Sequence, residues 1–475
     1  FYSFPVGSRG QAAIPMELIE NGLEVIDVST GEVVEHEIYV IPDARAPVPH
    51  AAYRYAMSRH DPGEGIEVRF VARDIPAMGY KIYRFAPAGT SKAGSARDSG
   101  GPRVVAGPNT LENNFYRIEL DPATGAISSI RDKQLDRELV DRGAEHGVNQ
   151  LVIRSSLTAE KSTVDGVSIE RGRTGRVSAS LVVKASAPGC PQVTQEIVLY
   201  SDTKRIDIAN RLLKDSAAHL ETFFAFPFAF DGPRFRYEGS LSVVQPLADQ
   251  FPGSNSEYHC VQHWADVSDE RAGVTLASVD APVMQFGGNW TLYVSQAHHG
   301  VTPPGFDHPF HAAGDVGKGH LYSLALLNNY RTNFAPAQCG DLLFRYSIAS
   351  HEGDWIKGRS RDFGYSVGLP LVTASVDGAG GGGLPASSSF VQIDRPNVIL
   401  LTLKRAEDST GLIARVMETE GQDTEFTITV PFVSLLQAFE TNLVEENIRL
   451  LPISEHSVTA RVRAWATATC RLVTQ

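Results

Sequence analysis

Histidine and carboxylate side chains gather in one stretch that is rich in glycine and proline. They are His298, His299, His308, His311, Asp315 and His320. A His-x-x-His spacing can place two imidazoles on one side of a turn, and imidazole and carboxylate are common zinc ligands. The surrounding glycines and prolines provide no rigid frame for such ligands. We therefore interpret the stretch as a polar loop and assign no metal ligand to this chain.

A second polar group directly follows the apolar run of residues 324–327. It consists of Asn328, Asn329, Arg331 and Asn333. Amide and guanidinium groups at the end of a strand can hydrogen-bond the hydroxyls of a ligand, but turn asparagines also bond their own backbone. We take these four residues as candidates for a substrate-binding rim.

Aromatic residues could complete such a site, because the CH face of a sugar ring packs on an aromatic ring. The candidates are Trp264, Trp290, Tyr322 and Tyr330. Burial in a β core is the commoner fate of such side chains. Of the four, we place Trp264 in the predicted substrate-binding set.

A carboxylate that faces a histidine can also serve as a general acid–base pair, for example to interconvert sugar anomers. His259, His263, Glu221 and Asp266 are available for this role. Any chain of 475 residues offers residues of these types. We therefore assign no catalytic residue.

The composition limits the class of protein. The net charge of −12 comes from 43 basic and 55 acidic residues without a long run of one sign, which argues against nucleic acid and anionic membranes as partners. No apolar run reaches the length of about 18 residues that crosses a membrane. Four widely spaced cysteines predict free thiols and a cytoplasmic protein. The first residue is Phe1 rather than an initiator methionine, which indicates a fragment.

Short alternating runs of apolar and polar residues predict an all-β protein. The clearest example is a hairpin formed by residues 116–120 and 126–130, joined by an Asp-Pro-Ala-Thr-Gly turn. We expect the charged pair Asp132 and Lys133 after it to face solvent. The one expected helix, at residues 12–21, is short.

Two segments poor in large apolar side chains divide the chain into three predicted β units. Residues 1–88 read as a small β-sandwich, 89–108 as a linker poor in large apolar side chains, and 109–370 as a large antiparallel supersandwich. A glycine-rich connector at 371–389 then leads to a C-terminal β-sandwich at 390–475.

Several of these segments resemble glycoside hydrolase family 38, the α-mannosidases. The hairpin region is similar to the family's E-N-x-F, D-P-x-T-G and D-K segments at Glu112, Asn113, Phe115, Asp121, Pro122, Thr124, Gly125, Asp132 and Lys133. Earlier in the chain, the family's A-R-D-x-P and G-Y strands are matched by Ala72, Arg73, Asp74, Pro76, Gly79 and Tyr80.

The later matches follow in the family's order. Residues 263–269 resemble its W-x-D-V-S segment, and residues 441–446 match a segment before its last strands. Residues 326–333 resemble its N-N-x-W-x-T-N stretch but are one residue shorter and lack the tryptophan. That departure weakens the transfer of any ligand contact to these positions.

The resemblance implies a galactose mutarotase-like supersandwich flanked by two smaller β-sandwiches. It also implies a retaining α-mannosidase whose aspartate nucleophile and zinc ion lie on an N-terminal barrel, which we expect upstream of Phe1. The predicted partners are an α-mannoside and that catalytic barrel of the same polypeptide, and homo-oligomerisation stays open. By this interpretation the chain is non-catalytic, braces the barrel and lines one side of the mannoside pocket.

Two alternatives remain. The chain could be a stand-alone carbohydrate-binding or scaffold protein that never had a barrel. It could also be an independent mutarotase or a polysaccharide lyase of similar architecture. Coding sequence upstream of Phe1 with a zinc-type His and Asp pair would favour the glycosidase.

Overall fold

The computed structural model describes residues 22–41, 65–90, 103–251, 254, 257–289, 316–328, 337–374, 376 and 382–474. Every strand pairing in these ranges is antiparallel, and the fold is all-β, as predicted. The helix expected at residues 12–21 lies outside the described ranges.

The N-terminal unit is a small set of short strands. β1 (Leu23–Asp27) lies between β2 (Val33–Val34) and β6 (Tyr83–Pro87), and β3 (His36–Ile41) pairs with β4 (Gly65–Phe70). Leu23, Val25 and Val68 form its buried core. The remaining strand, β5 (Gly79–Lys81), pairs with β27 (Ser387–Ser389) of the predicted glycine-rich connector. The connector therefore returns to the N-terminal unit.

The predicted hairpin forms the centre of a five-stranded sheet. β9 (Tyr116–Leu120) pairs with β10 (Ile127–Asp132), and the turn closes with Gly125 at φ 70°, a conformation that favours glycine. The sheet order is β11-β10-β9-β8-β7, with β7 at Val105–Ala106, β8 at Thr110–Glu112 and β11 at Arg137–Glu138. The strand β7 thus lies inside the segment predicted as a linker.

The expectation that Asp132 faces solvent is wrong. Its side chain is fully buried, and one carboxylate oxygen accepts hydrogen bonds from the backbone N–H groups of Gln134 and Leu135. The other oxygen lies 2.8 Å from Nζ of Lys204 and accepts the hydroxyl of Ser350. Burial alone would raise the pKa of Asp132, but these hydrogen bonds lower it below its usual value.

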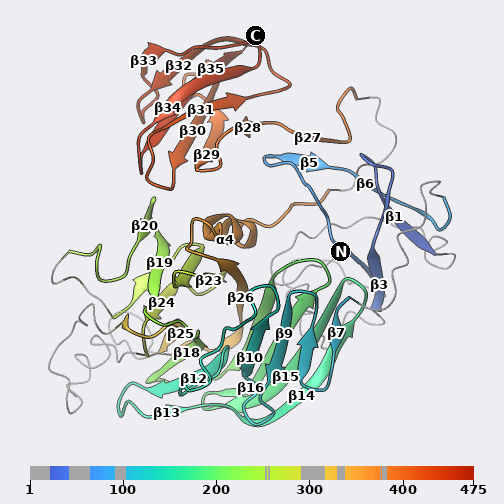
Figure 1. Ribbon diagram of the computed structural model, residues 1–475, viewed down its shortest axis with the longest axis vertical. Helices are drawn as coiled ribbons and strands as arrows, with labels where there is room; N and C mark the ends of the chain where they lie inside the picture. Colours follow the sequence, from blue (N-terminus) through green and yellow to red (C-terminus); the bar gives the residue numbers. More distant parts are fainter. Residues whose placement is uncertain are drawn as a thin grey trace.

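Two large sheets form the central domain (Figure 1). The nine-stranded sheet has the order β14-β15-β16-β17-β26-β23-β22-β19-β20, and the six-stranded sheet has the order β13-β12-β18-β25-β24-β21. The strands of the first are β14 (Asp165–Thr174), β15 (Ser178–Ala187), β16 (Cys190–Tyr200), β17 (Ile206–Lys214), β26 (Gly340–Glu352), β23 (Ala272–Ser278), β22 (Trp264–Ser268), β19 (Arg234–Gly239) and β20 (Ser242–Val244). Those of the second are β13 (Lys161–Ser162), β12 (Gln150–Ser155), β18 (Leu220–Pro227), β25 (His320–Asn328), β24 (Val283–Phe286) and β21 (His259–Cys260).

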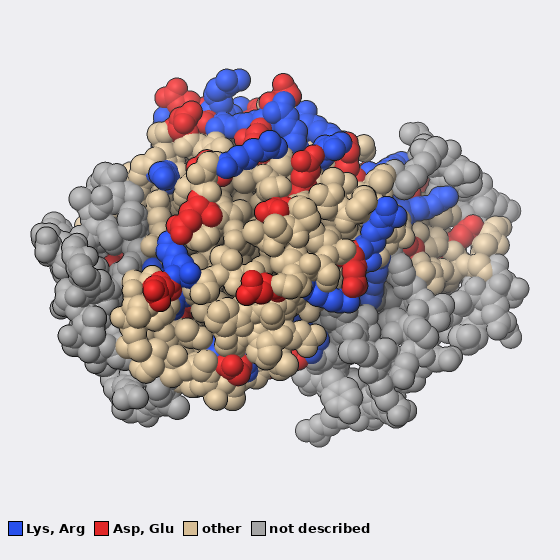
Figure 2. Space-filling view, turned by 90° about the horizontal axis from the view of Figure 1, so that it is seen from below, with Lys and Arg blue, Asp and Glu red and all other residues tan. Residues whose placement is uncertain are grey.

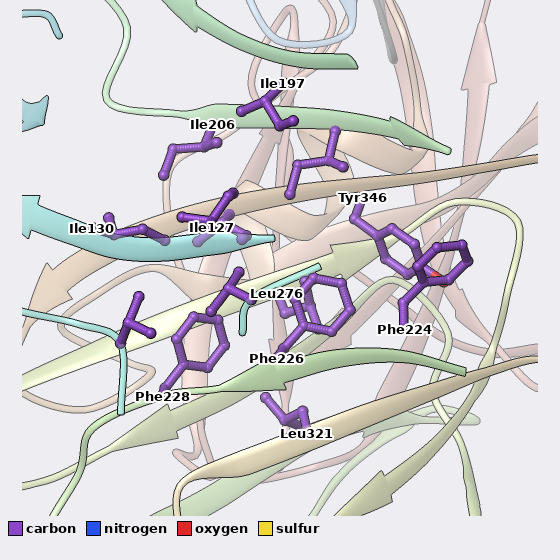
Figure 3. Close-up of a cluster of buried hydrophobic side chains, with 14 of the residues drawn as sticks. Ile127, Ile130, Ile197, Ile206, Phe224, Phe226, Phe228, Leu276, Leu321 and Tyr346 are labelled. Carbon is purple, nitrogen blue, oxygen red and sulfur yellow. The ribbon is translucent and has the colours of Figure 1, made fainter. Parts of the chain in front are cut away.

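One apolar core joins these two sheets and the hairpin sheet. Figure 3 shows Phe224 and Phe226 of β18 beside Tyr346 of β26, with Ile127 and Ile130 of β10 nearby. The rings of Phe226 and Tyr346 have centroids 5.0 Å apart. This packing of sheet on sheet gives the supersandwich that the strand pattern predicts.

The helix α4 (Ser360–Gly368) covers the outer face of the nine-stranded sheet at β22 and β23. The buried glycine Gly364 brings it close to the sheet, because a Cβ at this position would lie 2.7 Å from the ring of Trp264.

A substitution tests this close approach. Gly364→Ala should reduce the free energy of unfolding by about 1–3 kcal/mol, because the added methyl group overpacks the contact with Trp264. Thermal unfolding measures the effect. Ser366→Ala on the exposed side of the same helix is the control, and an equal loss in both variants would contradict the tight contact.

The C-terminal unit is a separate β-sandwich. A three-stranded sheet of β28 (Gln392–Ile393), β31 (Thr424–Thr429) and β34 (Ser457–Val462) packs on a five-stranded sheet. The second sheet has the order β29-β30-β35-β32-β33, formed by Val398–Arg405, Leu412–Glu418, Thr467–Thr474, Leu435–Thr441 and Asn447–Leu450. Phe426, Ile428 and Leu472 lie in the core between them.

A row of indole rings connects this sandwich to the central domain. Trp264 stacks on Trp355 with centroids 5.5 Å apart, and Trp355 stacks on Trp465 of the C-terminal sandwich at 6.5 Å. Arg361 of α4 adds hydrogen bonds to the hydroxyl of Thr419 and the carbonyl of Pro396. Figure 1 shows α4 between the two domains, so the helix and the indoles form their junction.

Candidate functional site

The most unusual polar feature of the central domain is a buried ion pair on the outer face of the six-stranded sheet. Arg154 of β12 and Glu221 of β18 are direct cross-strand partners. Nε of Arg154 donates to Oε2 of Glu221 at 2.6 Å, and each side chain is only 1% exposed. Burying two charges is costly unless they pair closely, so this contact fixes both side chains in one geometry.

Two amide side chains extend this pair along the same face. Nη1 of Arg154 donates to Oδ1 of Asn289 at 3.0 Å, and Nδ2 of Asn289 donates to Oε1 of Gln285 at 3.2 Å. The Arg154 guanidinium also lies 4.7 Å from the centre of the Phe223 ring. We call Arg154, Glu221, Gln285 and Asn289 the outer-face polar cluster. Its positive and negative charges balance, so the cluster is suited to holding these side chains in fixed positions.

Asn328 lies on the opposite side of this sheet. The register pairs it with Leu220, whose side chain packs against the main core, so Asn328 faces inward and is 4% exposed. Its backbone oxygen accepts the N–H of His219. Its side-chain oxygen makes no hydrogen bond within the described residues. Asn329, Arg331 and Asn333 lie outside the described ranges.

Trp264 is fully buried, which argues against its predicted contact with a substrate. Its ring is enclosed by Trp355 on one side and by α4 next to Gly364. It therefore offers no face to a sugar, and we assign it a packing role at the domain junction. Tyr322 is also buried, while Trp290 and Tyr330 lie outside the described ranges.

The four residues considered for acid–base chemistry do not form one site. Glu221 pairs with Arg154, and His259 packs within an aromatic group that contains Tyr237 and Phe286. His263 lies beside Glu238, and Asp266 accepts from His351 at 2.7 Å. The structure therefore distributes these residues over separate places in the two sheets.

The predicted histidine-rich loop is described only at its end. His320 begins β25, and its Nε2 lies 2.8 Å from Oδ2 of Asp141. Residues 298–315 lie outside the described ranges. No group of three or more histidine, cysteine or acidic side chains that could hold a metal occurs in the part of the chain that the structure describes.

A second titratable cluster lies at the C-terminal half of α4. The buried carboxylate of Glu238 accepts Nδ1 of His263 at 2.8 Å and the hydroxyl of Tyr365 at 2.9 Å, and the two rings stack at 4.6 Å. The hydrogen bond to Glu238 raises the pKa of His263 above its usual value. Sequence spacing gave no signal for this cluster, because its members are up to 127 residues apart.

The raised pKa of His263 can be measured directly. A titration followed by NMR should show His263 losing its proton above pH 6.5, and Glu238→Gln should lower this pKa by removing the negative partner. Because the folded pKa is raised, the stabilisation from this pair is fully present below the unfolded pKa and is lost as pH rises through the folded value. An unchanged His263 titration in Glu238→Gln would contradict the assignment.

On the face that Figure 2 shows, basic and acidic residues are interspersed with broad uncharged areas. No helix within the described ranges is long and apolar enough to cross a membrane.

Comparison with protein families matches two parts of the chain. Residues 111–281 match the glycosyl hydrolases family 38 C-terminal domain, and residues 397–469 match the family 38 C-terminal β-sandwich domain. The first match covers most of the central domain, and the second covers most of the terminal sandwich. Both lie in the order that the motifs predict.

One relative and two solved structures align with most of this chain. The chain is 22% identical over 369 residues to alpha-mannosidase G of Dictyostelium discoideum. This alignment covers 72% of this chain and 30% of the Dictyostelium protein. An alpha-mannosidase from Enterococcus faecalis aligns with 97% of the chain and 52% of its own length, at a TM-score of 0.63 and 13% identity. A family 38 protein from Enterococcus faecalis aligns with 96% of the chain and 53% of its own length, at a TM-score of 0.64 and 13% identity.

The chain thus spans about half the length of these two structures and less than a third of the Dictyostelium protein. Both matched models are C-terminal domains, and their order along the chain agrees with the fold described above. This chain belongs to the C-terminal region of glycosyl hydrolase family 38.

Proposed function

We propose that this chain is the non-catalytic C-terminal part of a retaining α-mannosidase-like glycoside hydrolase. It braces a catalytic barrel of the same polypeptide and lines one side of a mannoside pocket. The observation that carries this proposal is the paired match to both C-terminal family domains, together with α-mannosidase relatives that are much longer than the aligned region.

The polar segment after β25 is our proposed sugar-facing wall. Asn328 ends that strand but faces the core, so the proposed wall consists of Asn329, Arg331 and Asn333, which follow it in the sequence. Amide and guanidinium groups in this arrangement can bind sugar hydroxyls. The outer-face polar cluster lies on the same sheet and links Arg154 and Glu221 of β12 and β18 to Gln285 of β24 through Asn289. Trp264 and Asn328 are not included, because both side chains are buried.

The chemistry belongs to the catalytic barrel. Retaining hydrolysis needs two carboxyl groups about 5–5.5 Å apart on either side of the scissile bond. We place the zinc ion implied by the family on that barrel; within the described residues of this chain, no group of three or more histidine, cysteine or acidic side chains could hold a metal. The residues of this chain provide the shape of the pocket wall and hydrogen bonds.

The four free cysteines are our basis for proposing a cytoplasmic location.

An activity assay tests this proposal. We would measure hydrolysis of an aryl α-mannoside, with zinc present, by this chain and by the complete product of its gene. The chain alone should be inactive, and the longer protein should release the aryl group with retention at the anomeric carbon.

Circular dichroism of both samples controls for folding. Activity of the chain alone would contradict a non-catalytic role. Two folded but inactive proteins would contradict the mannosidase assignment and favour a stand-alone carbohydrate-binding or scaffold protein.

A further inference from the structure

Two carboxylates of the nine-stranded sheet domain hold the helix α4, one near the start of the helix and one near its end. Oδ2 of Asp266 on β22 accepts the hydroxyl of Ser360, the first residue of α4, at 2.8 Å. Oε1 of Glu238 on β19 accepts the hydroxyl of Tyr365 at 2.9 Å. The attachment of α4 to the sheet therefore depends in part on two acidic side chains.

Each of these carboxylates also accepts a hydrogen bond from a histidine. Nε2 of His351 on β26 lies 2.7 Å from Oδ2 of Asp266, and Nδ1 of His263 lies 2.8 Å from Oε2 of Glu238. The side chains of Asp266 and Glu238 are 0% and 8% exposed. An ionised carboxylate at this depth is costly unless a positive charge lies beside it. A protonated imidazole supplies that charge at both places.

The positions of both rings favour the protonated form. Nδ1 of His351 lies 3.4 Å from the backbone oxygen of Glu352, so both ring nitrogens of His351 face an acceptor. His263 lies beside the C-terminal end of α4, because a Cβ at Gly368 would be 2.6 Å from its Cδ2. The dipole of a helix favours a cation at this end.

His351 has one negative partner and one opposing positive group. Burial alone would lower the pKa of His351, but the hydrogen bond to Asp266 raises this pKa above its usual value. The positive charge of Lys204 opposes this rise. Glu352 and Lys357, which neighbour His351, form an exposed ion pair with each other. The charge that compensates Asp266 is therefore that of His351.

His263 has a comparable environment under the second half of α4. The hydrogen bond to Glu238 raises the pKa of His263 above its usual value. The ring of Tyr365 stacks on the imidazole with centroids 4.6 Å apart. Arg361 brings positive charge to the same side of α4, but its guanidinium pairs with Asp362.

The helix that these groups hold is part of the junction between two domains. Figure 1 shows α4 between the central domain and the C-terminal sandwich, and Arg361 bonds the hydroxyl of Thr419 in that sandwich. The row of indoles from Trp264 through Trp355 to Trp465 crosses the same junction. Separation of α4 from the sheet would expose these rings to water.

We propose that the two histidine–carboxylate pairs, His351–Asp266 and His263–Glu238, form a pH-sensitive switch that controls the attachment of α4 and the C-terminal sandwich to the central domain. Below the ordinary pKa of histidine, both imidazoles are charged and α4 is held. As pH rises through the raised folded values, both positive charges are lost. The buried carboxylates then favour an open junction in which water reaches them. The switch goes beyond the proposed function and does not depend on it.

Hydrogen–deuterium exchange of this chain, followed by mass spectrometry, tests the proposal at about pH 5.5 and about pH 8.5. Exchange rates are corrected for the intrinsic effect of pH, and α4 is compared with the core strand β16. The protection of α4 should fall severalfold at the higher pH, whereas that of β16 should not change. Circular dichroism at both pH values controls for folding.

Tryptophan fluorescence provides a second measurement of the junction. Three of the four tryptophans of this chain belong to the indole row. Quenching by acrylamide should therefore increase between the lower and the higher pH.

A double variant assigns the response to the two pairs. His263→Gln with His351→Gln removes both titrating groups, so the protection of α4 should no longer depend on pH. His456→Gln is the matched control, because His456 lies 3.6 Å from Glu455 on the C-terminal sandwich, and it should keep the wild-type response. If the double variant does not fold, His263→Gln alone decides, since this ring is 29% exposed and its loss should remove part of the response.

The switch would be contradicted by equal protection of α4 at both pH values in the wild-type chain. It would also be contradicted if the folded double variant, or His263→Gln in its place, kept the full wild-type response. A parallel loss of protection in β16 would overturn it as well, because the whole domain would then be unfolding rather than the junction opening.

Discussion

Glu221→Ala should reduce the free energy of unfolding by about 3–5 kcal/mol, because it leaves the Arg154 guanidinium buried without its carboxylate. At 1% exposure, Arg154 has almost no access to water that could replace the lost partner. Urea unfolding followed by circular dichroism measures the change. We expect this to be the largest effect of any single substitution considered for this chain.

A double variant separates the cost of an unpaired charge from the value of the pair. Arg154→Met with Glu221→Leu replaces both groups by apolar side chains and should recover most of the lost stability. Glu270→Ala, in the exposed pair with Arg234, should change stability by less than about 0.5 kcal/mol. If Glu221→Ala behaved like this control, the burial of the pair would be contradicted.

The second large effect concerns Asp132, which links the hairpin sheet to β26. Asp132→Asn should cost about 2 kcal/mol, because Lys204 and Ser350 lose a charged acceptor in a buried position. The Lys204 side chain is 22% exposed and can regain some water, which keeps the cost below that at Glu221. Urea unfolding at several pH values measures the difference between the two proteins.

The lowered pKa of Asp132 determines how the stability difference between the two proteins changes with pH. Because the folded pKa of Asp132 is lowered, its stabilisation is present above the unfolded value of about 3.9 and is lost as pH falls through the folded value. The gap between wild type and Asp132→Asn should therefore be widest above about pH 4 and should shrink in stronger acid. Asp136→Asn is the control, because Asp136 is 87% exposed in its side chain. A gap of the same size at every pH would contradict the ionised, hydrogen-bonded state of Asp132.

The local pattern of the sequence predicted the strands well. Residues 116–120 alternate between apolar and polar, and β9 has these same bounds with Tyr116, Ile118 and Leu120 buried. The turn at Asp121–Gly125 needed only local chemistry, which is why proline and glycine identify it. The two family 38 domains were also recognisable, because their motifs occur in order along the chain.

The environments of individual side chains were harder to predict. Asp132 ends β10 just before a turn and looks like a surface residue, but the packing of β26 brings Ser350 from 218 positions away to its carboxylate. Trp264 looked like a sugar-stacking residue, but α4 and Trp355 cover its ring. In both cases the deciding neighbour comes from a distant part of the chain.

The sequence by itself therefore determined the all-β class, the hairpin and the family, because alternation, turn residues and ordered motifs are local properties. Only the tertiary structure decided the Arg154–Glu221 pair, the Glu238–His263–Tyr365 cluster and the His351–Asp266 pair. Arg154 appears in the sequence as one charge at the end of an apolar run, with no sign of its partner 67 positions later. The register of antiparallel strands brings such residues together, and that register is fixed by packing between the sheets rather than by any one segment.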